Sequence, residues 1–104
     1  MGQGRGAPAR AARLRTVIEE PWVTSEADSA GDKFERGEEA FEAIKWAIAR
    51  DPENGIPLNG AGLFAWFIQG AISIGLPTVA AVYTVMGNEI TIKAVRFAEA
   101  QQVH

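Results

Sequence analysis

Apolar positions in the first part of the chain predict a strand followed by a short helix. The segment Leu14–Glu19 is rich in apolar and β-branched residues, which favours a first strand that Pro21 ends. Ser25 stands three residues before Asp28, a pattern typical of a helix N-terminus. We therefore expect a short helix over about residues 25–35.

A second helix is predicted from Glu38 to Arg50. Phe41, Ile44 and Ile48 recur at spacings of three and four residues, which places them on one face. The acidic residues of its first turns suit the positive end of the helix dipole. Their pattern is typical of a solvated face rather than of a metal site. The apolar residues of this helix should form the helical side of the core.

Three strands are predicted in the second half of the chain. They span Leu63–Ile72, Thr78–Met86 and Glu89–Phe97. Gly87 and Asn88 separate the last two strands and favour a two-residue hairpin turn with positive φ. The order of elements predicts an α+β fold: an N-terminal strand, two helices, then a three-stranded antiparallel meander, with the helices packed on one face of the sheet.

The meander is apolar on both faces, whereas a sheet covered on one side should alternate between apolar and polar residues. Helices from a chain of 104 residues suffice for one face only. A contiguous exposed apolar face usually marks a binding site for a partner. The alternative is that a terminal segment of the chain covers this second face. The predicted partner-binding residues are Leu63, Ala65, Phe67, Ala80, Val82 and Met86.

The same region could also be a membrane-spanning helix. Residues 54–88 carry no formal charge, and residues 61–86 are long enough to cross a bilayer as a helix. However, Gln69, Gly70 and Pro77 interrupt the stretch, and its apolar pieces are short and rich in β-branched and aromatic residues. We therefore expect strands and no membrane association.

Composition narrows the possible chemistry. The chain has no cysteine, which excludes disulfides, a thiol nucleophile and a cysteine metal site. Its one histidine is His104, the last residue printed, so a histidine-based triad or a multi-histidine metal site is not expected. No motif indicates a cofactor. The length predicts one domain, residues 14–104, preceded by a tail of glycine, alanine and arginine over residues 1–13.

Charge is distributed unevenly along the chain. Residues 1–15 carry +4 and residues 16–53 carry −7, within a net charge of −3. The acidic body is a poor electrostatic match for nucleic acid, although the arginine-rich tail could contact it. No apolar segment follows the N-terminal arginines as it would in a secretory signal, which predicts a cytoplasmic protein.

Two segments carry a resemblance to a known family. IARDPENGIPLNGAGLFAWFI (48–68) resembles the helix end, linker and following strand of the RelE/ParE-type toxins of bacterial toxin–antitoxin pairs. TVAAVYTVMGNEITIKAV (78–95) is similar to the hairpin of that superfamily. The resemblance spans about residues 14–97. It implies a small α+β fold, an antitoxin partner, and either ribosome-dependent mRNA cleavage or inhibition of DNA gyrase.

The chain departs from the family pattern where RNA-cleaving members carry basic residues. The strand beginning at Leu63 has no basic residue, and Ala80 stands where an arginine is typical. The remaining catalytic candidates are Tyr83, Lys93 and Arg96. Phosphodiester cleavage needs an acid, a base and cations, but Lys93 and Arg96 are three residues apart in a strand and should point to opposite faces. A core tyrosine, a solvated lysine and an Arg96–Glu99 ion pair are the simpler interpretations.

Four hypotheses follow for the function. The first is a toxin-fold protein that binds a partner, an antitoxin, through the apolar sheet face. The second is an active mRNA endoribonuclease that contacts the ribosome, and the third is a structural domain that associates with a second copy of itself. The fourth is the small membrane protein. The absence of basic residues from residues 54–88 favours the first over the endoribonuclease.

Overall fold

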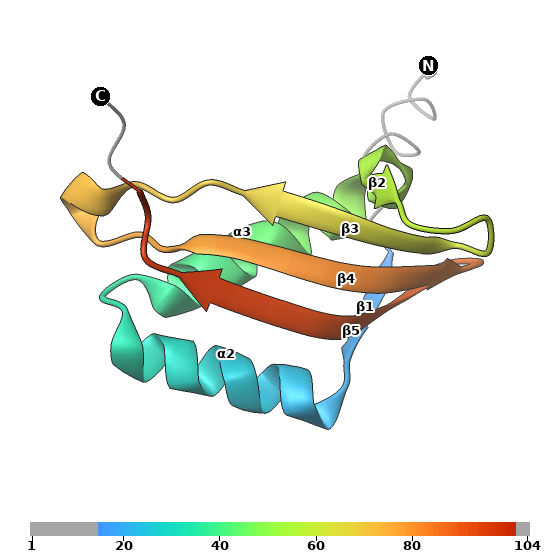
Figure 1. Ribbon diagram of the computed structural model, residues 1–104. Coiled ribbons are helices and arrows are strands. Elements are labelled where there is room, and N and C mark those ends of the chain that lie inside the picture. Colours follow the sequence, from blue (N-terminus) through green and yellow to red (C-terminus); the bar gives the residue numbers. More distant parts are fainter. Residues whose placement is uncertain (1–14, 102–104) are drawn as a thin grey trace, which may run out of the picture.

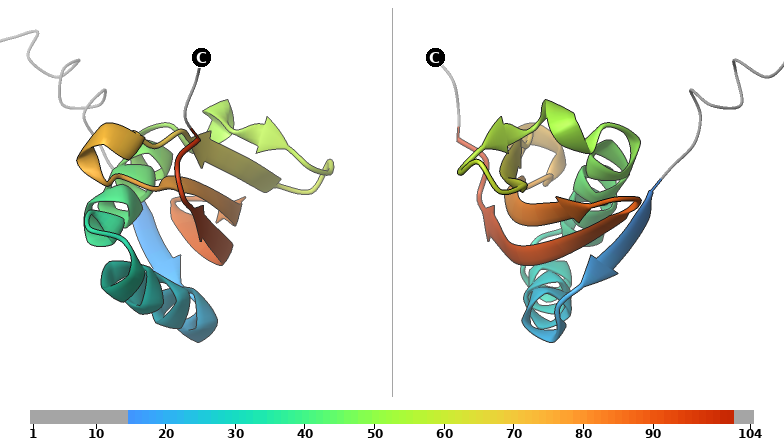
Figure 2. Two further views of the ribbon diagram at one scale, coloured as in Figure 1. Left: turned by 60° about the vertical axis from the view of Figure 1, so that its left-hand side comes forward. Right: turned by 90° about the vertical axis from the view of Figure 1, so that its right-hand side faces the viewer.

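The computed structural model describes residues 15–101, so the predicted tail 1–13, Leu14 and residues 102–104 lie outside the described part. Residues 15–101 form an α+β domain of two layers (Figure 1). One layer is a five-stranded mixed sheet, and the other consists of the two α-helices of this part of the chain. Both helices lie on the same side of the sheet (Figure 2), as the sequence predicts.

The first strand, β1 (Thr16–Glu19), leads directly into helix α2 (Pro21–Lys33). The prediction that this helix begins near Ser25 was wrong, because Pro21 starts it. Proline suits the first turn of a helix, where its missing N–H has no intrahelical partner in any case. The earlier start places Val23 in the core, where it is fully buried.

Helix α3 (Gly37–Arg50) confirms the predicted amphipathic helix to within one residue. Phe41, Ile44 and Ile48 are all buried against the sheet. Gly37 begins the helix at a point of close approach, since a Cβ there would overlap the carbonyl of Ala30 in α2. Glycine thus permits the tight connection between α2 and α3.

The first strand of the meander is shorter than predicted. Strand β3 spans Leu63–Ile68 rather than Leu63–Ile72. Beyond it, Ala71 pairs with Leu76 in an isolated antiparallel bridge around the short 3₁₀ helix η2 (Ile72–Ile74). Gly75 closes this turn in a left-handed conformation with φ of +74°.

A short strand that the sequence did not predict lies at the edge of the sheet. Strand β2 consists only of Ile56–Pro57 and pairs antiparallel with β3. It follows the 3₁₀ helix η1 (Pro52–Asn54). Proline is tolerated at a sheet edge because no further strand needs its missing N–H.

Strands β4 (Thr78–Met86) and β5 (Glu89–Ala98) form the predicted hairpin. Gly87 has φ of +62°, whereas Asn88 has no positive φ. A positive φ at the first central position alone is typical of a type II′ turn. The turn therefore depends on Gly87.

The strand order is β1-β5-β4-β3-β2, so the N-terminal strand lies at one edge, beside the last strand. The pair β1–β5 is parallel, while every other pair is antiparallel. The sheet is consequently mixed and five-stranded, whereas the sequence predicted an N-terminal strand and a three-stranded antiparallel meander.

A bulge interrupts strand β5 at Lys93. Val82 pairs with Ala94 and Tyr83 with Ile92, which leaves Lys93 as an extra residue. Its carbonyl accepts a hydrogen bond of 2.6 Å from the Trp22 indole of α2. Its ammonium pairs with Glu20 at 2.9 Å. The bulge thus meets the beginning of helix α2.

The uncharged part of the chain forms mainly strands and turns. Within residues 15–101, no helix is long and apolar enough to cross a membrane. Within this uncharged part, strand β4 packs its core-facing residues against the helices.

Tyr83 lies at the centre of this core and is fully buried. Its ring stacks on Phe64 with centroids 5.7 Å apart. Its hydroxyl donates a hydrogen bond of 2.6 Å to the carbonyl of Pro52. Burial, with a smaller contribution from the negative charge of Asp51, raises the pKa of Tyr83 to about 12.

Tyr83 is the sole tyrosine of the chain, so phenolate absorbance reports it alone. We expect a titration midpoint of about 12 in the folded protein and near the ordinary value of 10.0 in denaturant. Because folding raises this pKa, the stabilisation is complete below pH 10 and is lost as the pH rises toward 12. A folded-state midpoint near 10 would contradict the burial.

Candidate partner-binding surface

The face of the sheet opposite α2 and α3 carries no layer from the described residues (Figure 2). All six residues predicted to bind a partner lie on this side, because they alternate with the core residues of β3 and β4. We call this surface the open face. The strand register adds further residues to it. Together its residues are Thr16, Ile18, Ile56, Leu63, Ala65, Phe67, Thr78, Ala80, Val82, Thr84, Met86, Glu89, Thr91, Ala94, Arg96 and Ala98.

The centre of the open face is made of small side chains. Ala65, Val82 and Ala94 are neighbours in one row across β3, β4 and β5. The next row consists of Phe67, Ala80 and Arg96. The first row is therefore small and apolar, whereas the second flanks Ala80 with the large Phe67 and the charged Arg96.

Large apolar side chains stand toward the ends of this surface. Phe67 at the end of β3 is 60% exposed, and Met86 at the end of β4 is 77% exposed. Ile56 on the edge strand is 62% exposed. Side chains of this size contribute most to the binding energy of an interface when a partner covers them.

Positive charge on the open face comes from Arg96 of β5. None of the ion pairs between described residues includes Arg96. The predicted pair with Glu99 is therefore absent from residues 15–101. Glu99 lies beyond the strand, beside Phe34 and Glu35 near the end of α2, away from the open face.

The three catalytic candidates do not come together. Tyr83 points into the core and bonds to Pro52, which agrees with its interpretation as a packing residue. Lys93 sits in the bulge and pairs with Glu20, while Arg96 lies on the open face. An acid, a base and a phosphate-binding cation need to converge on one substrate, and this arrangement does not provide that geometry.

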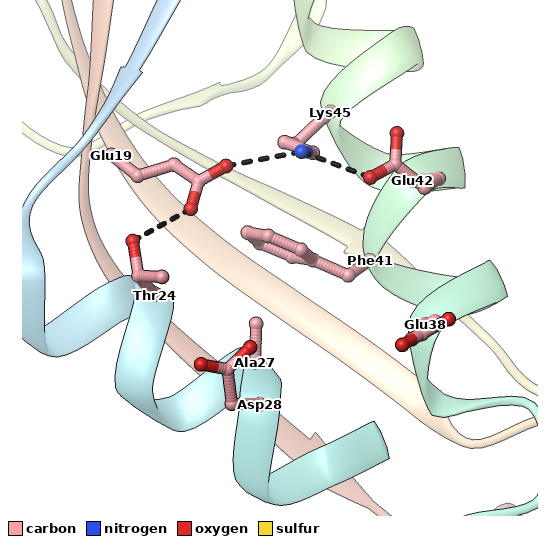
Figure 3. A pocket seen from close by; sticks show the side chains of 8 residues that line it. All are labelled: Glu19, Thr24, Ala27, Asp28, Glu38, Phe41, Glu42 and Lys45. Atoms are coloured by element: carbon pink, nitrogen blue, oxygen red, sulfur yellow. Dashed lines mark hydrogen bonds and ion pairs between the residues drawn. The ribbon is translucent and has the colours of Figure 1, made fainter.

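The hollow between α2, α3 and β1 is the second candidate site (Figure 3). It encloses about 380 Å³, with Phe41 and Ala27 among its lining residues. Four carboxylates surround it, from Glu19, Asp28, Glu38 and Glu42. Within residues 15–101, no group of three or more histidine, cysteine or acidic residues is arranged to hold a metal.

Lys45 neutralises part of this acidic hollow. Its ammonium lies 3.0 Å from both Glu19 and Glu42, and 4.6 Å from the ring centroid of Phe41. Burial by itself lowers the pKa of Lys45, but the hydrogen bonds to these two carboxylates and their charges outweigh it, so the pKa is raised. The network joins α3 to β1 and is a structural ion pair rather than an open site.

Comparison with known proteins adds no relative. No family model, curated protein or solved structure matches this chain.

Sequence reasoning missed the parts of the open face that come from outside β3 and β4. Ile18 enters through the parallel pairing of β1 with β5, and Ile56 through the unexpected strand β2. Ala94 and Arg96 face this side because the bulge at Lys93 shifts the alternation of β5. The apolar character of Ile18 and Ile56 was visible, but their strand partners were not.

Neighbouring alanines of β4 test which face is covered. Ala81→Asp buries a carboxylate at a position 2% exposed and should destabilise the fold by about 3 kcal/mol or more. Ala80→Asp places the same group on the open face and should cost about 1 kcal/mol or less. Urea unfolding measures both. Equal losses would mean that the open face is covered.

The ion pairs of Lys45 lead to a second prediction about stability. Glu19→Gln weakens a partly buried contact, with both partners 22% exposed, and should lower the free energy of unfolding by about 1 kcal/mol. Glu39→Gln is the matched control, because Glu39 is 62% exposed and 3.6 Å from Arg36. Chemical denaturation should show almost no change for this control. If Glu39→Gln costs as much as Glu19→Gln, the role of the Lys45 network is refuted.

Proposed function

We propose that this protein is a RelE/ParE-like toxin-fold protein that acts by binding another protein, as the toxin component of a toxin–antitoxin pair. The open face is its binding surface, and cleavage of RNA is not its activity. The single observation that carries the proposal is a sheet covered by helices on one face and lined with apolar side chains on the other.

The order of elements supports the family assignment. A strand, two helices and an antiparallel set of strands follow one another within residues 15–101. This is the order that the resemblance of residues 48–68 and 78–95 implies. The assignment rests on these patterns, because fold alone does not determine function.

The composition of the open face supports binding rather than catalysis. An exposed sheet face in a free-standing domain normally carries polar residues. Here Ala65, Val82 and Ala94 form its centre, and Phe67 and Met86 rise at its ends. Covering these side chains removes apolar surface from water and stabilises a complex by about 25 cal/mol per Å² before the costs of association.

The scattered placement of the catalytic candidates argues in the same direction. Arg96 is the cation that the open face offers, and neither Lys93 nor Tyr83 reaches it. In a binding surface, a single arginine fits an acidic residue of a partner protein. A partner of this kind is an acidic, amphipathic polypeptide, such as an antitoxin.

Controlled expression in a bacterial host tests the function. Induction of the intact chain should arrest growth, and co-expression of the product of the adjacent gene should restore it. Val82→Asp should leave the arrest but abolish its reversal by co-expression, because it places a carboxylate in the centre of the interface with the antitoxin. Lys93→Ala should leave the arrest intact, since its ammonium pairs with Glu20 away from the open face.

Three outcomes would overturn the proposal. Normal growth with a high yield of folded intact protein excludes a toxin. Loss of arrest in Lys93→Ala with an unchanged unfolding midpoint points to catalysis instead. A mass of two chains in light scattering, reduced to one chain by Val82→Asp and accompanied by normal growth, would favour the self-associating domain.

A further inference from the structure

The outer edge of strand β3 is only half covered. The partner strand β2 pairs with Phe64 and Ala65 through Pro57 and Ile56, and the pairing ends there. The chain before Ile56 turns into η1 rather than continuing along β3. Within residues 15–101, no strand pairs with the outer edge of β3 from Trp66 to Ile68.

The backbone of Phe67 points toward this uncovered edge. The carbonyl of Leu63 accepts a hydrogen bond from Leu58, on the β2 side of the strand. Gly62 instead bonds to Val85 of β4. Backbone groups alternate between the two sides of a strand, so Ala65 and Phe67 face outward with Leu63. The N–H and C=O of Phe67 are thus open to a further strand.

A cleft borders this edge on each side of the sheet. On the open face, a cleft of about 380 Å³ is lined by Asn54, Gly55, Ile56, Ala65, Trp66 and Phe67. On the helix side, a cleft of about 520 Å³ is lined by Ala47, Arg50, Asp51, Asn54 and Trp66. Asn54 and Trp66 line both clefts, so the two hollows meet at the edge of β3.

Tyr83 explains why the edge is left uncovered. Its hydroxyl holds the carbonyl of Pro52, which draws η1 toward the helix side of the sheet. Gly55 crosses directly over that hydroxyl, where a Cβ would overlap the hydroxyl oxygen. The chain therefore cannot run straight along β3 before Ile56, and β2 stays short.

We propose that the edge of β3 at Phe67 is a binding site for an extended segment of another polypeptide, which adds to the sheet as a further strand. Successive side chains of an added strand point to opposite faces. The residue opposite Phe67 would enter the open-face cleft, and the residue opposite Trp66 would enter the helix-side cleft. The two clefts lie where such alternation requires them.

The chemistry of the clefts specifies the segment. Ile56, Ala65 and Phe67 select an apolar side chain on the open face. Arg50 and Asp51 carry opposite charges and, with Asn54, favour a neutral side chain that both donates and accepts hydrogen bonds. The segment therefore alternates valine or isoleucine with threonine, serine or asparagine.

The β3 edge of a second copy cannot pair with this edge in antiparallel register. Antiparallel pairing of two β3 edges about Phe67 would set the partner's strand β2 against the chain that follows Ile68. The register leaves only Trp66 to Ile68 uncovered, so a free extended segment fits and a second β3–β2 pair does not. The site does not depend on the proposed toxin function, and its tests are separate.

Amide exchange measured by NMR tests the site on the intact chain. In the protein alone, the Phe67 amide should exchange much faster than the Trp66 amide, which faces β4. A panel of blocked heptapeptides that alternate Val or Ile with Thr or Asn is then added. We expect at least one to slow exchange at Phe67 by about tenfold or more. A matched peptide with an N-methylated central residue, which lacks the pairing N–H, should have no effect.

Substitutions in η1 test whether the peptide binds at the edge of β3 rather than elsewhere on the surface. Asn54→Trp puts a bulky side chain at a position that lines both clefts, and it should weaken peptide binding by about tenfold or more. Glu53→Trp is the control, since Glu53 is exposed in the same turn and lines neither cleft. Met86→Asp, at the far corner of the open face, should leave peptide binding unchanged.

Several results would overturn the site. They are a slowly exchanging Phe67 amide in the protein alone, a panel without any effect at Phe67, and equal affinity of the N-methylated peptide. Peptide binding of undiminished affinity to a folded Asn54→Trp variant would also overturn the site. If growth arrest fails while peptides bind, the toxin proposal falls and the edge site stands. If growth arrest occurs but no peptide binds, the edge site is refuted and the toxin proposal stands.

Discussion

The structure depends on one constraint: helices α2 and α3 cover one face of the sheet and no more. Val23, Phe41, Ile44 and Ile48 fill the space between the layers, and Val79, Ala81 and Tyr83 meet them from β4. The buried hydrophobic cluster of the described domain lies on that side. The opposite face lies outside this core, yet most of its residues are apolar. The proposal of a partner rests on this apolar surface outside the core.

The charged residues are also distributed differently on the helix side and on the open face. The acidic residues gather on and beside the helices, where Lys45 holds Glu19 and Glu42. The open face has Arg96 with few other charges near its centre. The two sides therefore present different chemistry: the helices repel acidic molecules, while the sheet accepts an apolar surface with an acidic group. For the partner proposed above, this difference favours approach from the sheet side.

Much of the fold could be predicted from local patterns. The spacing of Phe41, Ile44 and Ile48 identified α3, and the bounds of β4 were predicted to the residue. Features that depend on distant contacts were missed. The start of α2 at Pro21 required recognising that proline can open a helix as well as end a strand. The bulge at Lys93 depends on Trp22, which is 71 residues away, so no local pattern indicates it.

The same reasoning explains what was predicted of the binding surface. The six residues named from β3 and β4 follow from simple alternation, which holds in both strands. Ile56 belongs to a strand of two residues, too short to leave a periodic signal. The uncovered edge at Phe67 results from the hydrogen bond between Tyr83 and Pro52, across 31 residues. Such a contact becomes visible only once the chain is folded.

The parallel pairing of β1 with β5 has a consequence for synthesis of the protein. Thr16 pairs with Glu89, so β1 cannot join the sheet until β5 has been synthesised. During translation, β1, α2 and α3 leave the ribosome before any sheet exists to receive their apolar sides. Helix α3 can form early through local contacts, but its packing surface stays exposed until the hairpin emerges. Over that interval the nascent chain is vulnerable to aggregation and proteolysis, and completion of the C-terminal strand is the step that protects it.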